Sequence, residues 1–485
     1  MLFNSLDFAI FLPIVFCIYW MLGRAGLKIQ TFFILLASLF FYGWWDWRFL
    51  GLIVLSSVID FFCGIVIYSN SARGLRRPWV LWLSLVSNLG LLFFFKYFNF
   101  FSREFSAAFS FFGVEFSQDS LEIVLPVGIS FYTFQTLSYS IDVWRGNLKP
   151  VNDPIVFLAF VSFFPQLVAG PIERAFNLLP QFQEKRKFDY REAVTGLRQI
   201  LWGLFKKMVI ADNCAVSVNE IFDNPGNYNG SVLCLGAILF AFQIYGDFSG
   251  YSDIALGTGR LFGFKLMRNF NYPYFSRDIA EFWRRWHISL STWFRDYLYI
   301  PLGGSRTTLQ VKIRNTFLVF LISGFWHGAN WTFVVWGLLH AIFYLPLLVM
   351  AKNRTHLDPI ATGRLFPSFR ELYSIGKTFF IVCFAWIFFR AESLSAAVNF
   401  ISDIPNFIEG APGQILLFLL KPHCLFVALL VVVEWFGRNM EFPLDFGNLK
   451  VPIPVVFRWG VYLFFSLLIT LYAVKMNINF IYFQF

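Results

Sequence analysis

Residues 316–350 read TFLVFLISGFWHGANWTFVVWGLLHAIFYLPLLVM, a stretch without a single Asp, Glu, Lys or Arg. A helix needs about 20 apolar residues to cross roughly 30 Å of hydrocarbon, so this stretch is long enough for two crossings. Gly324 and Gly328 flank a histidine at its centre. The stretch therefore either breaks there into two elements or continues as one helix, and both cases predict a membrane protein.

Similar apolar runs recur along the whole chain. Hydrophobic residues make up 58% of the 485 residues and charged residues only 14%, which an ordinary water-exposed surface does not tolerate. We expect about 11 to 13 crossings by the same length criterion. The expected spans are 6–22, 30–45, 50–68, 79–95, 121–141, 155–169, 193–211, 231–246, 316–350, 374–390, 413–435 and 456–475.

The charge pattern also fits a membrane protein. The formal net charge is +10, but the basic residues gather between the apolar runs, as the positive-inside rule expects, so we predict no nucleic-acid partner. The six cysteines show no paired spacing for disulfides or zinc. The first run, 6–22, lacks a basic start and a clear cleavage site, so we expect it to be retained. With no long linker or repeat, residues 1–485 are predicted to form a single transmembrane domain.

A basic amphipathic element is predicted between residues 180 and 212. Apolar residues recur there at helical spacing, at Val194, Leu197, Leu201, Leu204 and Met208. The basic residues are Lys185, Arg186, Lys187, Arg198, Lys206 and Lys207. We expect these cations to face anionic lipid headgroups, with a contact surface for an anionic donor as the alternative.

Two of the five histidines lie in dense aromatic and polar contexts. The two contexts are Trp283-Arg284-Arg285-Trp286-His287 and Phe325-Trp326-His327-Gly328-Ala329-Asn330-Trp331. An ionisable side chain inside a membrane is costly and therefore a functional candidate, and aromatic surroundings favour the neutral imidazole that a general base requires. His327 and His287 are thus the predicted catalytic residues.

The neighbours of these histidines are candidate substrate-binding or tunnel-lining residues. His327 lies thirteen residues beyond Arg314, or about 20 Å along a helix, which places it deep in the membrane. On a continuous helix Ser323, Asn330 and Trp331 would share its face and orient the ring. Trp326, Trp283 and Arg284 complete this set. A packing role for His327, and a purely structural network around His287, are the alternatives, and His340 is expected to be a core residue.

Two polar stripes enter the apolar middle of the chain. The first contains Gln135, Ser138, Tyr139 and Asp142, and the second contains Gln243, Asp247, Gly250 and Tyr251 and continues to Asp253. Each stripe follows helical spacing and is predicted to line a polar tunnel. Hydrogen bonding between buried helices is the alternative. No histidine accompanies Asp247 and Asp253 in a compact ligand set, so no metal site is predicted.

Several motifs of soluble enzymes are missing. The sequence has no Walker-type phosphate loop, no G-x-S-x-G elbow, no H-E-x-x-H pair and no G-x-G-x-x-G fingerprint. ATP-driven transport, serine hydrolysis and redox chemistry therefore lose support.

An ordered series of motifs resembles the membrane-bound O-acyltransferase (MBOAT) superfamily, and within it the alginate O-acetyltransferase branch. The motifs are Phe3-Asn4-Ser5, Phe11-Leu12-Pro13, Leu125-Pro126-Val127-Gly128-Ile129-Ser130-Phe131, residues 164–172 (FPQLVAGPI), Asp247-Phe248-Ser249-Gly250-Tyr251-Ser252-Asp253, 282–287, Ile300-Pro301-Leu302-Gly303-Gly304, Trp326-His327-Gly328 and the aromatic tail 480–485. They extend over nearly the entire chain, so the resemblance is specific.

The resemblance implies an all-α, polytopic protein of the cell inner (cytoplasmic) membrane, with helices around a funnel or tunnel and additional re-entrant or interfacial helices. It implies that His327 is the essential intramembrane histidine and His287 a second histidine of this branch. It further implies acetyl transfer from a thioester such as acetyl-CoA, a co-substrate rather than a bound cofactor. The acceptor would be an extracytoplasmic polysaccharide such as alginate, reached through an extracytoplasmic acetyltransferase partner protein.

Related activities stay open at this point. They are acetylation of cellulose or peptidoglycan and transfer of D-alanine to teichoic acid. A polysaccharide or lipid-linked sugar transporter without covalent chemistry also explains the polar stripes, but not the Trp-His-Gly context.

Overall fold

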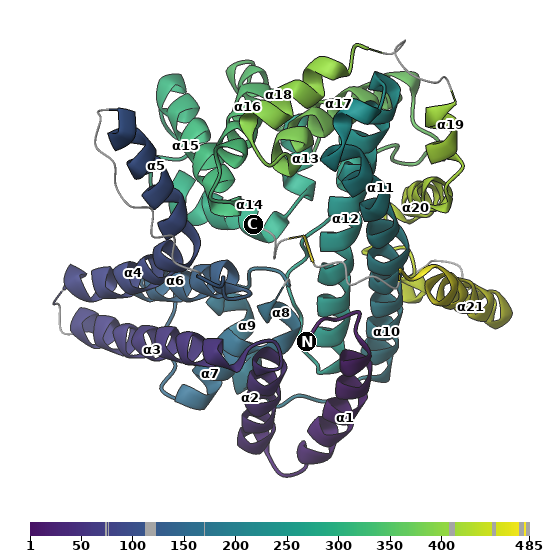
Figure 1. The fold of residues 1–485 in the computed structure, drawn as a ribbon. Helices are drawn as coiled ribbons and strands as arrows, with labels where there is room; N and C mark the ends of the chain where they lie inside the picture. Colours follow the sequence, from purple (N-terminus) through teal and green to yellow (C-terminus); the bar gives the residue numbers. More distant parts are fainter. Residues whose placement is uncertain are drawn as a thin grey trace. The chain divides into compact units, whose positions relative to one another are not determined.

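The computed structural model describes residues 1–72, 75, 77–111, 123–168, 170–406, 413–448, 453–474 and 480–481. Within these ranges the chain forms helices and connecting segments and no strand (Figure 1). The expectation of an all-α membrane protein is confirmed. Of the motifs above, Ala169 and most of the aromatic tail lie outside the described residues.

Six helices in the described ranges are long and apolar enough to cross a membrane by length and composition. They are Trp47–Ser71, Pro78–Ser110, Gly230–Leu261, Trp331–Val349, Phe369–Arg390 and Val455–Tyr472. Three shorter apolar helices are Leu6–Leu22, Leu27–Gly43 and Pro422–Gly437. Other expected spans form shorter elements, such as 155–169, which folds as α7 (Pro154–Ser162) and α8 (Phe164–Leu167) because Pro165 cannot continue the preceding helix.

The chain divides into two compact units. Unit 1 comprises Met1–Ala193 and Thr258–Met267, and unit 2 comprises Val194–Gly257 and Arg268–Phe485. Unit 1 contains α1 (Leu6–Leu22), α2 (Leu27–Gly43), η1 (Trp47–Phe49), α3 (Leu50–Ala72), α4 (Pro78–Leu92), η2 (Phe93–Tyr97), α5 (Phe98–Phe111), α6 (Ile129–Arg145), α7, α8 and α9 (Ala175–Gln183).

Unit 2 holds the rest of the helices, including most of α10 and α12. They are α10 (Tyr190–Leu204), η3 (Phe205–Ala211), α11 (Asp212–Asp223), η4 (Pro225–Asn227), α12 (Gly230–Leu261), η5 (Pro273–Phe275), α13 (Ile279–Arg285), α14 (Ile288–Phe294), η6 (Arg295–Tyr299), α15 (Leu309–His327), α16 (Trp331–Val349), α17 (Phe369–Arg390), α18 (Leu394–Asp403), α19 (Gln414–Leu419), α20 (Pro422–Gly437), η7 (Phe446–Asn448) and α21 (Val455–Tyr472).

A buried carboxylate joins three helices of unit 1. Asp60 on α3 is fully buried and accepts hydrogen bonds from Asn88 Nδ2 on α4 (2.7 Å) and Ser140 Oγ on α6 (3.1 Å). Ser84 Oγ on α4 donates to the same carboxylate. The helices α3, α4 and α6 lie side by side (Figure 1). Since lipid offers no hydrogen-bond partners, this network fixes how the three helices pack.

Replacing Asp60 with Ala is expected to destabilise unit 1. Three buried donors lose their acceptor, and each unsatisfied group costs about 1–3 kcal/mol. SDS titration of the purified protein in mixed micelles should therefore show a loss of unfolding free energy of about 3–9 kcal/mol when all three donors stay unsatisfied. Asp60→Asn retains one acceptor oxygen and should lose less. An Asp60→Ala protein as stable as the wild type would mean that the network contributes no net stability.

Close helix contacts in unit 2 depend on glycines. A Cβ at Gly324 of α15 would lie 2.3 Å from the carbonyl oxygen of Phe333, and a Cβ at Gly337 of α16 would lie 2.3 Å from that of Phe320. α15 and α16 therefore pack backbone to backbone, as small residues allow in membranes (Figure 1). Gly203 and Gly250 bring α10 and α12 together in the same way, because a Cβ at Gly203 would lie 2.6 Å from the Gly250 oxygen.

Candidate functional site

The two singled-out histidines lie together in unit 2. His327 is the last residue of α15, and His287 lies between α13 and α14. Their ring centroids are 6.3 Å apart, and both side chains are buried, with 3% and 0% of their surface exposed. Residues forty positions apart in the sequence are thus brought into one site.

Aromatic rings surround this pair. The Trp326 ring centroid lies 4.9 Å from that of His327 and 6.2 Å from that of His287. Trp336 and Phe389 contact the His327 ring at 5.1 and 5.5 Å, and Phe248 contacts the His287 ring edge-on at 4.7 Å. These surroundings disfavour a charged imidazole, because burying a cation among aromatic side chains removes its hydration. Both rings are therefore enclosed by apolar surfaces.

The helix ends directly after His327. Gly328 is extended, and a Cβ there would lie 2.1 Å from the Phe333 ring, so no larger residue fits without moving that ring. Asn330 caps α16: its Oδ1 accepts from the Thr332 N–H (3.1 Å), and its Nδ2 donates to the Glu392 carbonyl (2.9 Å). Of the two alternatives for residues 316–350, the structure shows two separate helices, α15 and α16.

The break separates the residues that a continuous helix would have placed beside His327. Ser323, one turn earlier on α15, is buried and keeps its place on that face. Trp331 starts α16 and is 49% exposed, and the Asn330 side chain is committed to the cap and the Glu392 carbonyl. Only Ser323 of these three lies on the same helix as His327.

Trp283 and Arg284 of α13 have different surroundings. The Trp283 indole N–H donates to Nδ1 of His340 (3.3 Å). His340 is fully buried and contacts the Trp336 ring at 4.9 Å, and Trp336 in turn contacts His327. Arg284 instead donates to backbone carbonyls of the α16–α17 connection. The sequence marked His340 as a core residue, and only the structure places it one ring away from His327.

The first polar stripe lies on α6 in unit 1. Gln135 Nε2 donates to the Phe160 carbonyl of α7 (2.8 Å), and the Tyr139 ring packs on Phe157 of the same helix at 4.6 Å. Asp142 is buried near the C-terminal end of α6. These contacts of Gln135 and Tyr139 join neighbouring helices of unit 1.

The second stripe lies on α12 in unit 2, where Gln243 and Asp247 are buried. Asp247 forms an ion pair with Lys207 Nζ (2.7 Å) and accepts a hydrogen bond from the Ile481 backbone N–H (2.6 Å). Lys207 also pairs with Asp212 (2.8 Å). Phe248, the residue after Asp247, contacts His287, so this ion-pair network supports the helix segment beside the site.

The expectation that Lys206 and Lys207 face lipid headgroups is wrong. Both are buried, and Lys206 Nζ pairs with Asp253 (2.6 Å) and donates to Ser249 Oγ (2.9 Å). The two lysines lie in η3, a π-helical segment. The wider π turn rotates the side chains off the 3.6-residue pattern, and the buried Asp247 and half-buried Asp253 carboxylates of α12 are stabilised by cations.

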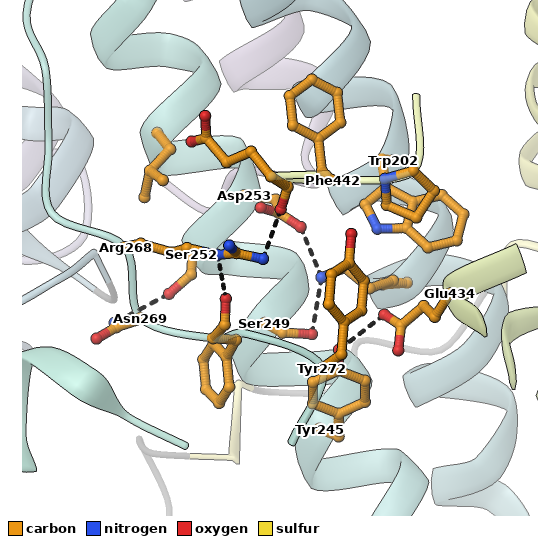
Figure 2. A pocket seen from close by; sticks show the side chains of 15 residues that line it. Trp202, Tyr245, Ser249, Ser252, Asp253, Arg268, Asn269, Tyr272, Glu434 and Phe442 are labelled. Carbon is orange, nitrogen blue, oxygen red and sulfur yellow. Dashed lines mark hydrogen bonds and ion pairs between the residues drawn. The ribbon is translucent and has the colours of Figure 1, made fainter. Parts of the chain in front are cut away.

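A polar pocket lies in unit 2 beside this network (Figure 2). Its lining residues are Trp202, Lys206, Tyr245, Ser249, Ser252, Asp253, Leu256, Arg268, Asn269, Phe270, Tyr272, Glu434, Glu441, Phe442 and Pro443. Its interior volume is about 20 Å³, enough for about one water molecule. In Figure 2, Tyr245 donates to Glu434 (2.7 Å), and Asn269 donates to Ser252 (3.0 Å).

One wall of this pocket is shared with the histidine site. The Asn269 carbonyl accepts from the Ile288 N–H (2.9 Å), directly after His287, and its Oδ1 accepts from Ser289 Oγ (2.6 Å). The Phe270 ring contacts both Phe248 and Trp286, at 5.0 Å each. Asn269 and Phe270 therefore support the His287 segment. Sequence reasoning missed them, because neither belongs to a helical polar stripe.

Comparison with known proteins gives a consistent result. The profile of a family described as "MBOAT, membrane-bound O-acyltransferase family" matches residues 151–384. A peptidoglycan O-acetyltransferase of Helicobacter pylori is 39% identical over 429 residues, covering 82% of this chain and 79% of the relative. The probable alginate O-acetylase AlgI of Pseudomonas aeruginosa is 39% identical over 398 residues, covering 82% and 73%. A teichoic acid D-alanyltransferase of Bacillus subtilis is 28% identical over 277 residues, covering 55% and 69%.

Proposed function

This chain belongs to the membrane-bound O-acyltransferase family, and on that premise we propose that it moves acetyl groups from a cytoplasmic thioester to an extracytoplasmic polysaccharide. The proposed donor is acetyl-CoA, a co-substrate, and the proposed acceptor is a polymer such as alginate. The proposed location is the cell inner membrane, with an extracytoplasmic acetyltransferase partner protein completing the transfer.

The observation that supports acyl transfer best is the buried histidine pair. His327 and His287 lie 6.3 Å apart inside an aromatic enclosure. The proposal takes both imidazoles as neutral, because an apolar enclosure disfavours a buried cation. A neutral imidazole is the general base that an acceptor hydroxyl needs, and general bases of this kind contribute about 10²–10⁴-fold to rate. A transporter without covalent chemistry does not need a general base beside a reacting hydroxyl.

The proposed reaction balances without a net proton. The oxygen of the first hydroxyl acceptor, from which the partner protein passes the acetyl group on to the polymer, attacks the thioester carbonyl carbon. The carbon–sulfur bond breaks, and an ester and a free thiol form. His327 takes the hydroxyl proton and returns it to the departing thiolate. In this proposal His287, whose ring centroid lies 6.3 Å from that of His327, contacts the same acyl group. An acetyl-imidazole on His327 is the alternative route, in which the acyl group passes to the ring first and to the hydroxyl second.

The names of the relatives suggest alternatives to the proposed donor and acceptor. One is named for peptidoglycan acetylation and another for teichoic acid D-alanylation. The higher identity and coverage of the acetylating relatives favour acetyl as the transferred group.

The direct test uses the purified protein in proteoliposomes with radiolabelled acetyl-CoA. Alginate, peptidoglycan fragments and teichoic acid are offered in turn, together with a membrane-free extract that supplies partner proteins. We expect labelled ester on a polysaccharide and an equal amount of free CoA. A second arm supplies labelled D-alanine on a carrier protein. Transfer of label in that arm alone would mean that the donor is the loaded carrier protein and not acetyl-CoA. Movement of polymer without any ester would favour the transporter and overturn the proposal.

A further inference from the structure

The helix that leads into His287 is too short to hold its own position. α13 has seven residues and ends two residues before His287. Isolated helices of this length are unstable in water, so tertiary contacts must set where α13 lies. His287 itself has a left-handed backbone (φ 43°), which is unusual for a residue with a side chain and is maintained only by its surroundings.

The contacts come from residues 351–365, which lie within the connection between α16 and α17 and which we call the strap. Arg284 of α13 donates from Nη1 to the Asn353 carbonyl (2.7 Å) and from Nη2 to the His356 carbonyl (2.8 Å). Arg277, just before α13, donates to the Asp358 carbonyl (2.7 Å). The planar guanidinium of Arg284 thus bridges two carbonyls of the strap at once.

The strap is anchored on its other side as well. Arg438 Nη2 donates to the Arg364 carbonyl (2.6 Å), and Trp435 Nε1 donates to the Leu365 carbonyl (2.9 Å). Ile360 and Ala361 are buried in an apolar cluster whose other core members are Tyr272 and Phe275. The strap is therefore a fixed support, and a hydrogen bond to its backbone restricts where α13 can move.

Arg284 differs from its basic neighbours in its partners. Arg277 and Arg285 both pair with Glu281, at 2.9 and 2.7 Å. In the part of the chain that the structure describes, Arg284 forms no ion pair, and its two hydrogen bonds go to neutral carbonyls of the strap. The guanidinium of Arg284 therefore connects α13 to the strap through charge-assisted hydrogen bonds, and it does not neutralise a carboxylate of α13.

From these contacts we infer that Arg284 is a positioning residue for His287. It ties α13 to the strap and so maintains the 6.3 Å spacing between the two histidine rings. The inference rests on the proposed function for its effect on rate. It does not require Arg284 to touch either substrate.

The test compares Arg284→Ala with Arg284→Lys and with Arg390→Ala as a matched control. Arg390 is an arginine of unit 2 on α17 that also bridges two acceptors, Asn219 and Asp223. We expect Arg284→Ala to lower kcat about 10- to 100-fold, as a misplacement of about 1 Å does, with KM for acetyl-CoA within about two-fold of wild type. Methylguanidinium added to Arg284→Ala should recover part of kcat. Arg284→Lys cannot bridge two carbonyls in a plane and should recover little. Arg390→Ala should keep the wild-type kcat.

Hydrogen–deuterium exchange gives a readout that needs no activity. Peptides covering 279–294 should exchange faster in Arg284→Ala than in the wild type. In Arg390→Ala the same peptides should exchange at the wild-type rate. If Arg284→Ala does not fold, Asn353→Ala tests the same bridge from the strap. Asn353 Nδ2 donates to Tyr344 Oη (3.1 Å). Loss of this hydrogen bond loosens the strap and should speed hydrogen–deuterium exchange at 279–294.

Three results would overturn the inference. They are an unchanged kcat with unchanged exchange, a raised KM at constant kcat, and a loss of activity explained entirely by the fraction of unfolded protein. A wild-type protein that transfers no acetyl from acetyl-CoA would instead refute the proposed function, while the exchange data would still decide whether Arg284 holds α13.

Discussion

Changing His327 to Ala is expected to lower acetyl transfer by about 10²–10⁴-fold, the contribution of a positioned general base. His327 ends α15 inside an aromatic enclosure, with Trp326, Trp336 and Phe389 around its ring. Alanine is tolerated at a helix end, so the protein should still fold and insert. The measurement is labelled ester formed per folded molecule, with folding checked by size-exclusion chromatography.

The control for this variant is His423→Ala. His423 is another buried histidine of unit 2, in the first turn of α20. The His423→Ala variant should transfer acetyl at nearly the wild-type rate, even if its Tm falls slightly. Wild-type transfer by His327→Ala would refute the role of His327 as base or acyl carrier. A parallel His287→Ala variant shows whether the second ring is needed for the chemistry or only for packing.

Replacing Gly324 with Leu is expected to prevent the hairpin of α15 and α16 from forming. A Cβ at Gly324 already lies 2.3 Å from the Phe333 carbonyl oxygen and 3.3 Å from the Gly337 Cα. Overpacking among side chains costs about 1–3 kcal/mol. The cost here should exceed that range, because the clashing atoms belong to the backbone of α16 and cannot move to another rotamer. His327 lies one turn further on the same helix, so any protein that folds should also lose activity.

Gly376→Leu is the matched control. Gly376 lies in α17, and a Cβ there would meet no atom within 4 Å. Thermal unfolding in detergent should show a Tm near wild type for Gly376→Leu and a large loss, or no folded protein, for Gly324→Leu. Equal Tm values for the two variants would contradict the backbone-to-backbone packing of α15 and α16.

The break after His327 could be anticipated from the sequence only as one of two alternatives. Two glycines near a histidine fit both a kink and a close helix contact. Gly324 serves the contact with α16, whereas Gly328 makes room for the Phe333 ring. Asn330 is a good N-cap residue that precedes the apolar run at Trp331, and only the structure shows that it caps α16.

The misplaced lysines show what a periodic pattern cannot reveal. Apolar spacing from 194 to 208 predicts an amphipathic helix with its lysines facing outward. Lys206 and Lys207 are instead buried because Asp253 and Asp247 lie opposite on α12. Such pairing depends on which helices become neighbours, and a π-helical segment changes the face on which both lysines lie.

Composition and the length of the apolar runs were sufficient to predict a helical membrane protein, since hydrocarbon forces the backbone to satisfy its own hydrogen bonds. The aromatic context of two histidines was sufficient to mark them as candidate reactive residues, because an ionisable ring in an apolar run is costly without a function. Only tertiary structure decided that these rings lie 6.3 Å apart and that Arg284 is bound to the strap. Both depend on the packing of short helices against segments distant in the chain, and local sequence patterns carry no information about such contacts.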